Sequence, residues 1–148
     1  MSHINKLSIK NFRGIKQLSQ DFGKERFIVL IGRGDSGKST ILRAIHAVLS
    51  PSWNLTFSDL DFYNQDTTQS IEIEVEISEL PSELLTDKKY GLFVINDLSD
   101  DNCNESDLCI VVQLIVDETL EPHWVVKAKE CSGIEDKVIS AQDRAMFA

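Results

Sequence analysis

Apolar and polar residues follow strand-like patterns over the first third of the chain. Residues 4–10 and 15–22 each place their apolar side chains on one face, and residues 11–14 between them are typical of a turn. This pattern predicts an antiparallel hairpin. The continuous apolar run over residues 27–31 predicts a third strand that is buried on both faces.

A helical period follows. Between residues 41 and 49 apolar side chains recur at spacings of three and four, namely Ile41, Leu42, Ile45, Val48 and Leu49 with Ala44 between them. The predicted helix ends near Ser50, because Pro51 cannot continue it. Residues 51–68 are polar and rich in turn formers, which predicts a surface excursion.

The second half of the chain reads mainly as strands. Residues 70–78 alternate strictly, with Ile71, Ile73, Val75 and Ile77 on one face and Glu72, Glu74 and Glu76 on the other. Residues 108–116 and 124–129 predict two further strands joined by a long turn over 117–123. A short helix is expected over 79–90.

The last expected elements are a loop over residues 96–106 and a helix near 141–147. Together these patterns predict an α/β fold in a single domain over residues 1–148. Its mixed sheet would contain an opening hairpin, strand and helix in residues 1–49 and an antiparallel β extension over 69–130.

Charge is distributed unevenly along the chain. The net charge is −9, yet residues 1–49 carry nine Lys or Arg against three acids, whereas residues 50–148 carry six against 21. The acidic portion disfavours direct binding of nucleic acid by this chain. It serves equally well as a solubilising face or an acidic docking surface.

Composition also bounds the location of the protein. A hydrophobic fraction of 42% is enough to fill one core, and no apolar run is long enough to span a bilayer. The three cysteines and three histidines lack metal-ligand spacing, and no secretion signal is evident. We expect a cytoplasmic protein with reduced cysteines and no membrane association.

The strongest motif is a phosphate-binding loop that lies between the predicted strand and the predicted helix. It matches GxxxxGK[ST] and comprises Gly32, Arg33, Gly34, Asp35, Ser36, Gly37, Lys38 and Ser39, with Thr40 following. Such a loop directs backbone N–H groups at phosphates. The motif predicts binding of a nucleoside triphosphate, with Lys38 on the β and γ phosphates and the Ser39 hydroxyl on Mg²⁺.

Hydrolysis needs a further carboxylate to hold Mg²⁺ through water and to polarise the attacking water. Asp117 and Glu118 are candidates, because four apolar residues precede them as in a Walker B strand. The same residues also fit as the start of the turn between the strands 108–116 and 124–129, and this hairpin interpretation is preferred. In that case the chain lacks a complete hydrolytic site.

The segments KNFRG at residues 10–14 and GRGDSGKST at 32–40 closely resemble the N-terminus of the RecF, SMC and OLD branch of ABC-type P-loop ATPases. The segment DLDFY at 59–63, followed by the alternating strand, is most similar to OLD-family proteins, including Gabija-type ATPase and nuclease proteins. Asparagine is common in this subgroup where Gly34 stands. The resemblance is specific over residues 4–49 and weaker beyond.

The resemblance implies roles for three further residues. Arg13 corresponds to an arginine that approaches the phosphates from the hairpin, although from the sequence it could equally face solvent in a turn. Gln142 could be the glutamine that touches Mg²⁺ in ABC-type sites. Asp61 is similar to an acid found after the first helix of OLD-like chains, and its role does not follow from the sequence.

The family comparison implies a function of the following kind. The chain would be the ATP-binding N-terminal lobe of an ABC-type head, acting as a homodimer or with a larger ATPase or nuclease partner. The signature motif and nuclease are absent, so nucleic acid would be bound only by other parts, in DNA repair, chromosome maintenance or phage defence. The alternatives are a complete small P-loop NTPase that uses Asp117 and Glu118, or a stand-alone nucleotide-sensing interaction module.

Overall fold

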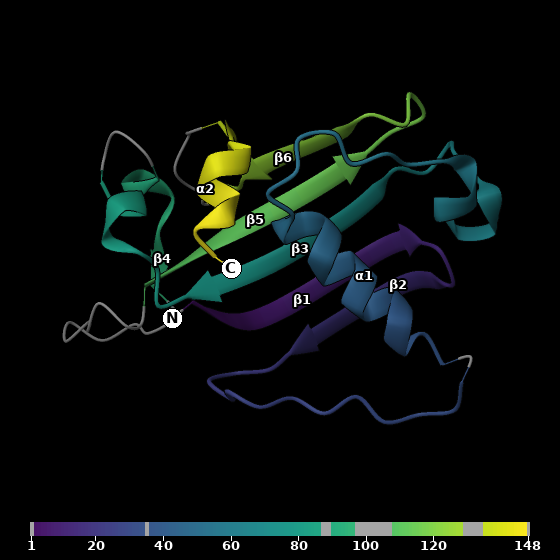
Figure 1. Cartoon of the computed structure of the whole chain (residues 1–148), viewed down its shortest axis with the longest axis horizontal. Helices are drawn as coiled ribbons and strands as arrows, with labels where there is room; N and C mark the ends of the chain where they lie inside the picture. The colour runs from purple at the N-terminus through teal and green to yellow at the C-terminus, as the bar shows by residue number, and fades with distance from the viewer. Residues whose placement is uncertain (1, 35, 87–89, 97–107, 129–134, 148) are drawn as a thin grey trace.

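The computed structural model describes residues 2–34, 36–86, 90–96, 108–128 and 135–147. Its strands form one sheet in the order β2-β1-β3-β5-β6-β7, with β4 paired to β5, and every pairing between them is antiparallel. The elements are β1 His3–Phe12, β2 Ile15–Asp21, α1 Lys38–Leu49, β3 Ile71–Ser78, β4 Ile95–Asn96, β5 Leu108–Val116, β6 Pro122–Val126, β7 Lys137–Val138 and α2 Ala141–Ala145. Figure 1 shows α1 lying across β1 and β3. The α/β class is confirmed.

The opening hairpin is formed as predicted. β1 and β2 pair from Lys6 opposite Asp21 to Phe12 opposite Ile15, and the turn between them lies over residues 13–14. Arg13 adopts a left-handed backbone conformation with φ 51°. Its position at the tip of the hairpin is therefore set by a tight turn that few residues other than glycine and asparagine readily adopt.

β3 is the central strand, and its alternation is confirmed. The four apolar residues of its inner face are at most 1% exposed and pack with α1 and the neighbouring strands, while its glutamates point to the opposite face. The register places Ile73 opposite Ile9 of β1 and Leu114 of β5. The period of two in the sequence thus becomes one apolar layer beneath α1.

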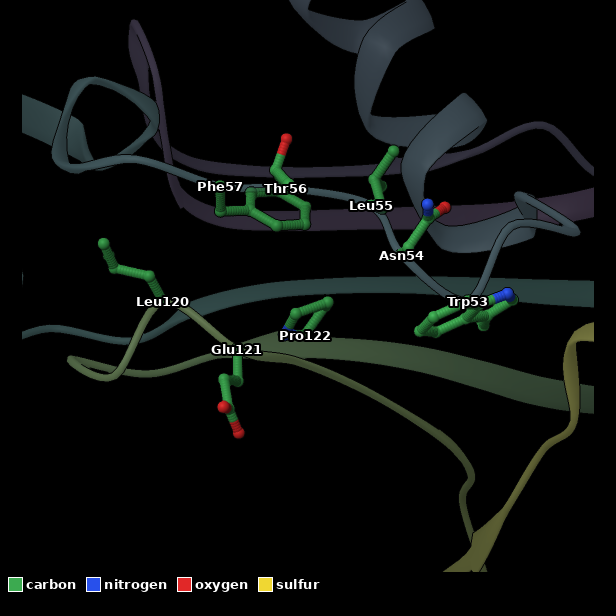
Figure 2. Close-up of a pocket in the computed structure, with 8 residues that line it drawn as sticks. All are labelled: Trp53, Asn54, Leu55, Thr56, Phe57, Leu120, Glu121 and Pro122. Atoms are coloured by element: carbon green, nitrogen blue, oxygen red, sulfur yellow. The ribbon is translucent and has the colours of Figure 1, made fainter.

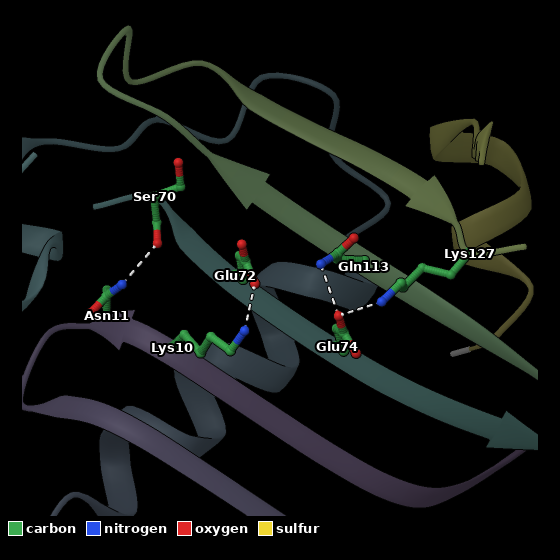
Figure 3. A network of polar contacts seen from close by, with 7 residues as sticks. All are labelled: Lys10, Asn11, Ser70, Glu72, Glu74, Gln113 and Lys127. Carbon is green, nitrogen blue, oxygen red and sulfur yellow. Dashed lines mark hydrogen bonds and ion pairs between the residues drawn. The ribbon is translucent and has the colours of Figure 1, made fainter. Parts of the chain in front are cut away.

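The opposite face of the sheet carries a polar network (Figure 3). The Lys10 ammonium lies 3.1 Å from a Glu72 carboxylate oxygen. One oxygen of Glu74 accepts hydrogen bonds of 2.9 Å from both Lys127 and Gln113. Ion pairing with Glu74 raises the pKa of Lys127, because it stabilises the ammonium form. The negative charges of Glu72 and Glu74 are therefore balanced by Lys10 of β1 and by Lys127, which follows β6.

The buried strand expected over residues 27–31 is not formed. This segment has no regular secondary structure, and Phe27 is 84% and Ile31 91% exposed. A strand needs neighbours that satisfy its backbone N–H and C=O groups, and none of the described strands pairs with it. An apolar hollow of about 310 Å³ lies between this segment, the hairpin and Ile41 of α1.

α1 ends at Leu49 as predicted and begins at Lys38, three residues before the helical period of the sequence, but its buried stripe differs from the expected one. Ala44, Ala47 and Val48 are at most 5% exposed, whereas Leu42 is 61% exposed. Leu42 points away from the buried Ala44, about 160° around the helix, since a helix turns about 100° per residue. Its inclusion in the core face was wrong.

Two predictions for segments that connect the strands also need correction. The excursion over 51–68 is not only a surface segment, because Phe62 is 1% exposed and bridges to Phe12. The helix expected over 79–90 is, within the described residues, a single 3-10 turn at Ser82–Leu84. The loop expected over 96–106 lies outside the described residues, apart from Asn96 in β4.

Candidate nucleotide-binding site

The phosphate-binding motif forms a tight loop before α1. A Cβ atom on Gly32 would meet the Ser36 hydroxyl oxygen, so a side chain at this position would force Ser36 to move. Gly37 has φ 82°, the left-handed conformation that glycine adopts without strain. A Cβ on Gly34 would meet nothing within 4 Å, so this glycine is not required by space. Backbone conformation therefore explains Gly37, and the neighbouring Ser36 side chain explains Gly32.

The Lys38 side chain folds back over the loop. Its ammonium donates hydrogen bonds to the carbonyl oxygens of Gly32, at 2.6 Å, and Arg33, and lies 3.0 Å from the Ser36 hydroxyl oxygen. The Ser36 hydroxyl donates in turn to the Arg33 carbonyl at 2.6 Å. The Lys38 ammonium is thus held at the carbonyl oxygens of the first two residues of the loop.

The N-terminus of α1 opens onto this loop. The first N–H groups of a helix have no acceptor within the helix, and its dipole places positive potential there. The first turn of α1 contains no acidic residue that would compete for these groups. Ser39 is exposed at this turn, and Thr40 is half-buried. Asp35 lies outside the described residues.

Arg13 is held by Asp61. Its Nε and Nη2 atoms lie 2.9 and 2.8 Å from one Asp61 carboxylate oxygen, and its backbone N–H donates to the Asp61 carbonyl oxygen at 2.7 Å. The guanidinium also lies 5.5 Å from the centre of the Phe12 ring. The pair borders a hollow of about 190 Å³ that Arg43 and His46 of α1 also line. Asp61, to which the sequence gave no role, thus fixes the arginine at the hairpin tip.

Asp117 and Glu118 lie in the turn between β5 and β6. The Asp117 carboxylate accepts hydrogen bonds from the hydroxyl and the backbone N–H of Thr119, and these bonds lower the pKa of Asp117. Glu118 is exposed in the same turn. The preferred hairpin interpretation is confirmed by the pairing of Leu114 with Trp124. Neither carboxylate has a contact with the phosphate-binding loop among the described residues.

Gln142 is exposed on α2. Arg144 of the same helix contacts the chain just after the C-terminus of α1, whereas the phosphate-binding loop precedes the N-terminus. Since α1 has 12 residues, its ends are about 18 Å apart. The structure does not bring Gln142 to the loop.

Metal binding by protein groups alone is not indicated in the described ranges. They contain no cluster of three or more His, Cys, Asp or Glu side chains that could hold a metal ion. Ser39, whose hydroxyl the sequence motif predicts to bind Mg²⁺, is exposed at the start of α1. The helices of the described part of the chain include none that is long and apolar enough to cross a membrane.

A separate pocket of about 420 Å³ lies beside β6 (Figure 2). The extended segment 53–57 forms one side and the turn at residues 120–122 the other, and the Glu121 carboxylate points away from segment 53–57. Apart from Glu121, the lining side chains are apolar or neutral polar, and they include no Lys or Arg. This pocket therefore lacks the positive charge that a phosphate chain needs.

Sequence comparison with protein families identifies the family to which the chain belongs. Residues 3–143 match the model of an AAA ATPase domain, which covers most of the chain. The chain belongs to this family, whose members are ATPase domains. No curated protein is significantly similar to it in sequence.

Comparison with solved structures identifies chains with a similar fold. One similar chain comes from work on "ATP-driven dimerization and DNA stimulated activation of SMC ATPases", with TM-score 0.57 and 15% identity over 98% of this chain and 77% of that chain. Another is the Smc head domain with a coiled coil and joint from Pyrococcus yayanosii, with TM-score 0.58 and 18% identity over 99% of this chain and 25% of that one. At such identities the likeness shows the fold alone, a P-loop NTPase fold that these SMC structures share.

Proposed function

We propose that this chain is the ATP-binding N-terminal lobe of an OLD-like ABC ATPase. ATP held between two such heads would drive their dimerisation, as a homodimer or with a larger ATPase or nuclease partner. This step would be coupled to a nucleic-acid process such as phage defence or DNA repair. The observation that carries the proposal is the loop curled around the Lys38 ammonium at the N-terminus of α1.

Membership in the AAA ATPase domain family supports ATP as the ligand. The dimerisation step is supported by the resemblance to the RecF, SMC and OLD branch and by the likeness to a chain studied for "ATP-driven dimerization". In this proposal Gly32 to Thr40 hold the phosphates and Ser39 binds Mg²⁺. Arg13 approaches the phosphates from the hairpin, as the family resemblance implies. The OLD-like assignment rests on the segments 10–14 and 59–63.

We further propose that the hydrolytic groups come from other segments. Asp117 and Glu118 are engaged in, or exposed at, a hairpin turn. The apolar segment 27–31 is exposed and lies over a hollow, which favours cover by additional protein. On this proposal the chain binds ATP without turning it over alone.

The decisive experiment is calorimetric titration of MgATP into the protein and into Lys38→Ala. We expect the substitution to abolish measurable binding, because a charge-assisted hydrogen bond contributes about 1.5–3 kcal/mol and Lys38 would supply more than one to the phosphates. The matched control is Lys10→Ala, since Lys10 is an exposed lysine on the opposite face of the sheet. Equal affinities in Lys38→Ala and the parent protein would overturn ATP binding at this loop.

Two further assays test the absent activities. The purified chain should release phosphate from ATP no faster than Lys38→Ala does, and turnover that disappears in Glu118→Gln would show that the β5–β6 turn is catalytic. Labelled duplex DNA should not bind at about 0.15 M salt, because residues 50–148 carry a large excess of acids. A retained DNA shift at micromolar protein would show that this lobe contacts DNA directly.

A further inference from the structure

α1 is anchored at one end. Its buried residues, Ala44, Ala47 and Val48, all lie in the second half of the helix. In the first half, Ser39, Leu42 and Arg43 are exposed, and the neighbouring segment 27–31 leaves a hollow beside Ile41. The direction of the helix is therefore set mainly by what holds its C-terminal end.

Arg144 of α2 is one part of that attachment. It is 2% exposed, and its guanidinium donates to the carbonyl oxygens of Ser50, at 2.7 Å, Ser52, at 3.0 Å, and Ile139, at 2.8 Å. Burial lowers the pKa of Arg144, because it disfavours the charged form. Ser50 is the C-terminal cap of α1, so the positive charge sits at the negative end of the helix dipole.

Trp124 of β6 is the other part. Its indole N–H donates to the Ala47 carbonyl oxygen at 3.1 Å, and the Arg144 guanidinium lies 4.0 Å from the centre of its ring. The last carbonyl groups of a helix have no donor within the helix. Trp124 and Arg144 together satisfy such groups at and just beyond the end of α1. Neither residue was singled out by the sequence, because their partners are main-chain atoms from distant segments.

We propose that Arg144 and Trp124 are positioning residues for the phosphate-binding loop. The inference rests on the proposed ATP binding and adds residues at the far end of α1 to it. Lys38 and Ser39 are the first residues of a 12-residue helix, so a tilt of about 5° at its C-terminal end displaces them by roughly 1.5 Å. Such a displacement exceeds the tolerance of hydrogen bonds to phosphate.

The test measures MgATP affinity by calorimetry in full-length variants whose folded state is verified by circular dichroism. Arg144→Lys keeps the charge but cannot present the planar fork of donors to three carbonyls. Trp124→Phe removes only the indole N–H bond. We expect affinity to fall about tenfold in Arg144→Lys and about threefold in Trp124→Phe, within the range seen for residues coupled to a distant site.

Ile77→Val is the matched control for general destabilisation. Ile77 is 1% exposed and lies opposite Ile4 and Ile110, at the end of the sheet away from the β1–β2 turn. A purely structural role for Arg144 predicts that all folded variants bind MgATP alike. A positioning role predicts that Ile77→Val binds as the parent does while Arg144→Lys and Trp124→Phe bind more weakly.

Fluorescence supplies a readout that stability alone does not change. The chain has two tryptophans, and replacing the exposed Trp53 by Phe leaves Trp124 as the reporter at the end of α1. We expect saturating MgATP to change Trp124 emission in Trp53→Phe, and to leave it unchanged when Lys38→Ala is added. This change in emission would report coupling between the phosphate-binding loop and the C-terminal end of α1.

The outcomes separate the two proposals. Failure of the parent protein to bind MgATP would overturn the proposed function. Binding that depends on Lys38, but with affinities in folded Arg144→Lys and Trp124→Phe within about twofold of the parent, would overturn the positioning role alone. Unchanged Trp124 emission at saturating MgATP would also overturn it. If Arg144→Lys does not fold, the MgATP affinity of Trp124→Phe alone decides whether the positioning role holds.

Discussion

The two halves of α1 meet different surroundings. The C-terminal half buries Val48 completely and ends in the hydrogen bonds from Trp124 and Arg144. The N-terminal half exposes Leu42 and adjoins the exposed segment 27–31. Stability is thus concentrated at the end away from the phosphate-binding loop, and the backbone groups at the loop end stay available for a ligand. Binding segments are commonly drawn from less stable parts of a fold in this way.

The largest expected difference between the two halves is in stability. Val48→Ala should lower the free energy of unfolding by about 2 kcal/mol, because it removes two buried methyl groups and leaves a cavity. Leu42→Ala removes more apolar atoms but should change it by less than about 0.5 kcal/mol, because Leu42 is 61% exposed. Urea unfolding of both variants measures the difference, and equal losses would show that both halves of α1 are packed alike.

A smaller effect is expected at the contact that holds α2. The Tyr90 hydroxyl donates to an Asp143 carboxylate oxygen at 2.9 Å, next to Arg144. Tyr90→Phe should lower the free energy of unfolding at neutral pH by about 1 kcal/mol, the usual net contribution of a hydrogen bond. An unchanged free energy of unfolding would mean that α2 is held without this bond.

Alkaline pH probes the same contact. Burial, and then the hydrogen bond to Asp143, raise the pKa of Tyr90 from 10.0 to about 12. The folded state therefore favours the neutral phenol. Its contribution to stability is complete below pH 10 and is lost as the pH rises through about 12. This part of the alkaline dependence should be missing in Tyr90→Phe, and an identical pH profile in both proteins would contradict the burial of Tyr90.

The smallest effect is expected in the exposed segment beside the loop. Ile31→Ser should change the free energy of unfolding by less than about 0.5 kcal/mol, because Ile31 is 91% exposed. It should also reduce self-association in size-exclusion chromatography, since contiguous exposed apolar residues promote association. A large loss of stability would show that residues 27–31 are packed in solution.

Much of the sheet followed from the sequence. The opening hairpin, the alternation of β3 and the β5–β6 hairpin rest on a period of two and on local turn formers, both of which act over a few residues. The end of α1 likewise follows from a helical period and Pro51. The strand expected over 27–31 was wrong, because apolar composition alone cannot supply a neighbouring strand.

The candidate site divides in the same way. The motif predicted the loop, in which Gly37 adopts a left-handed conformation and Lys38 lies on the carbonyl oxygens of Gly32 and Arg33. The pairing of Arg13 with Asp61 could not be predicted, because 47 residues separate them along the chain. Asp117 fitted both a Walker B strand and a turn until its bond to Thr119 and the pairing of β5 with β6 were seen.

By itself, the sequence determined what short-range chemistry controls: where glycine lets the backbone curl, where strands alternate, and where proline ends a helix. Only the tertiary structure decided which side chains meet across the sheet. It placed Arg144 and Trp124 on the carbonyl groups at the end of α1 and left segment 27–31 exposed. These outcomes depend on main-chain partners brought together from distant segments, and no local pattern of residue types encodes such partners.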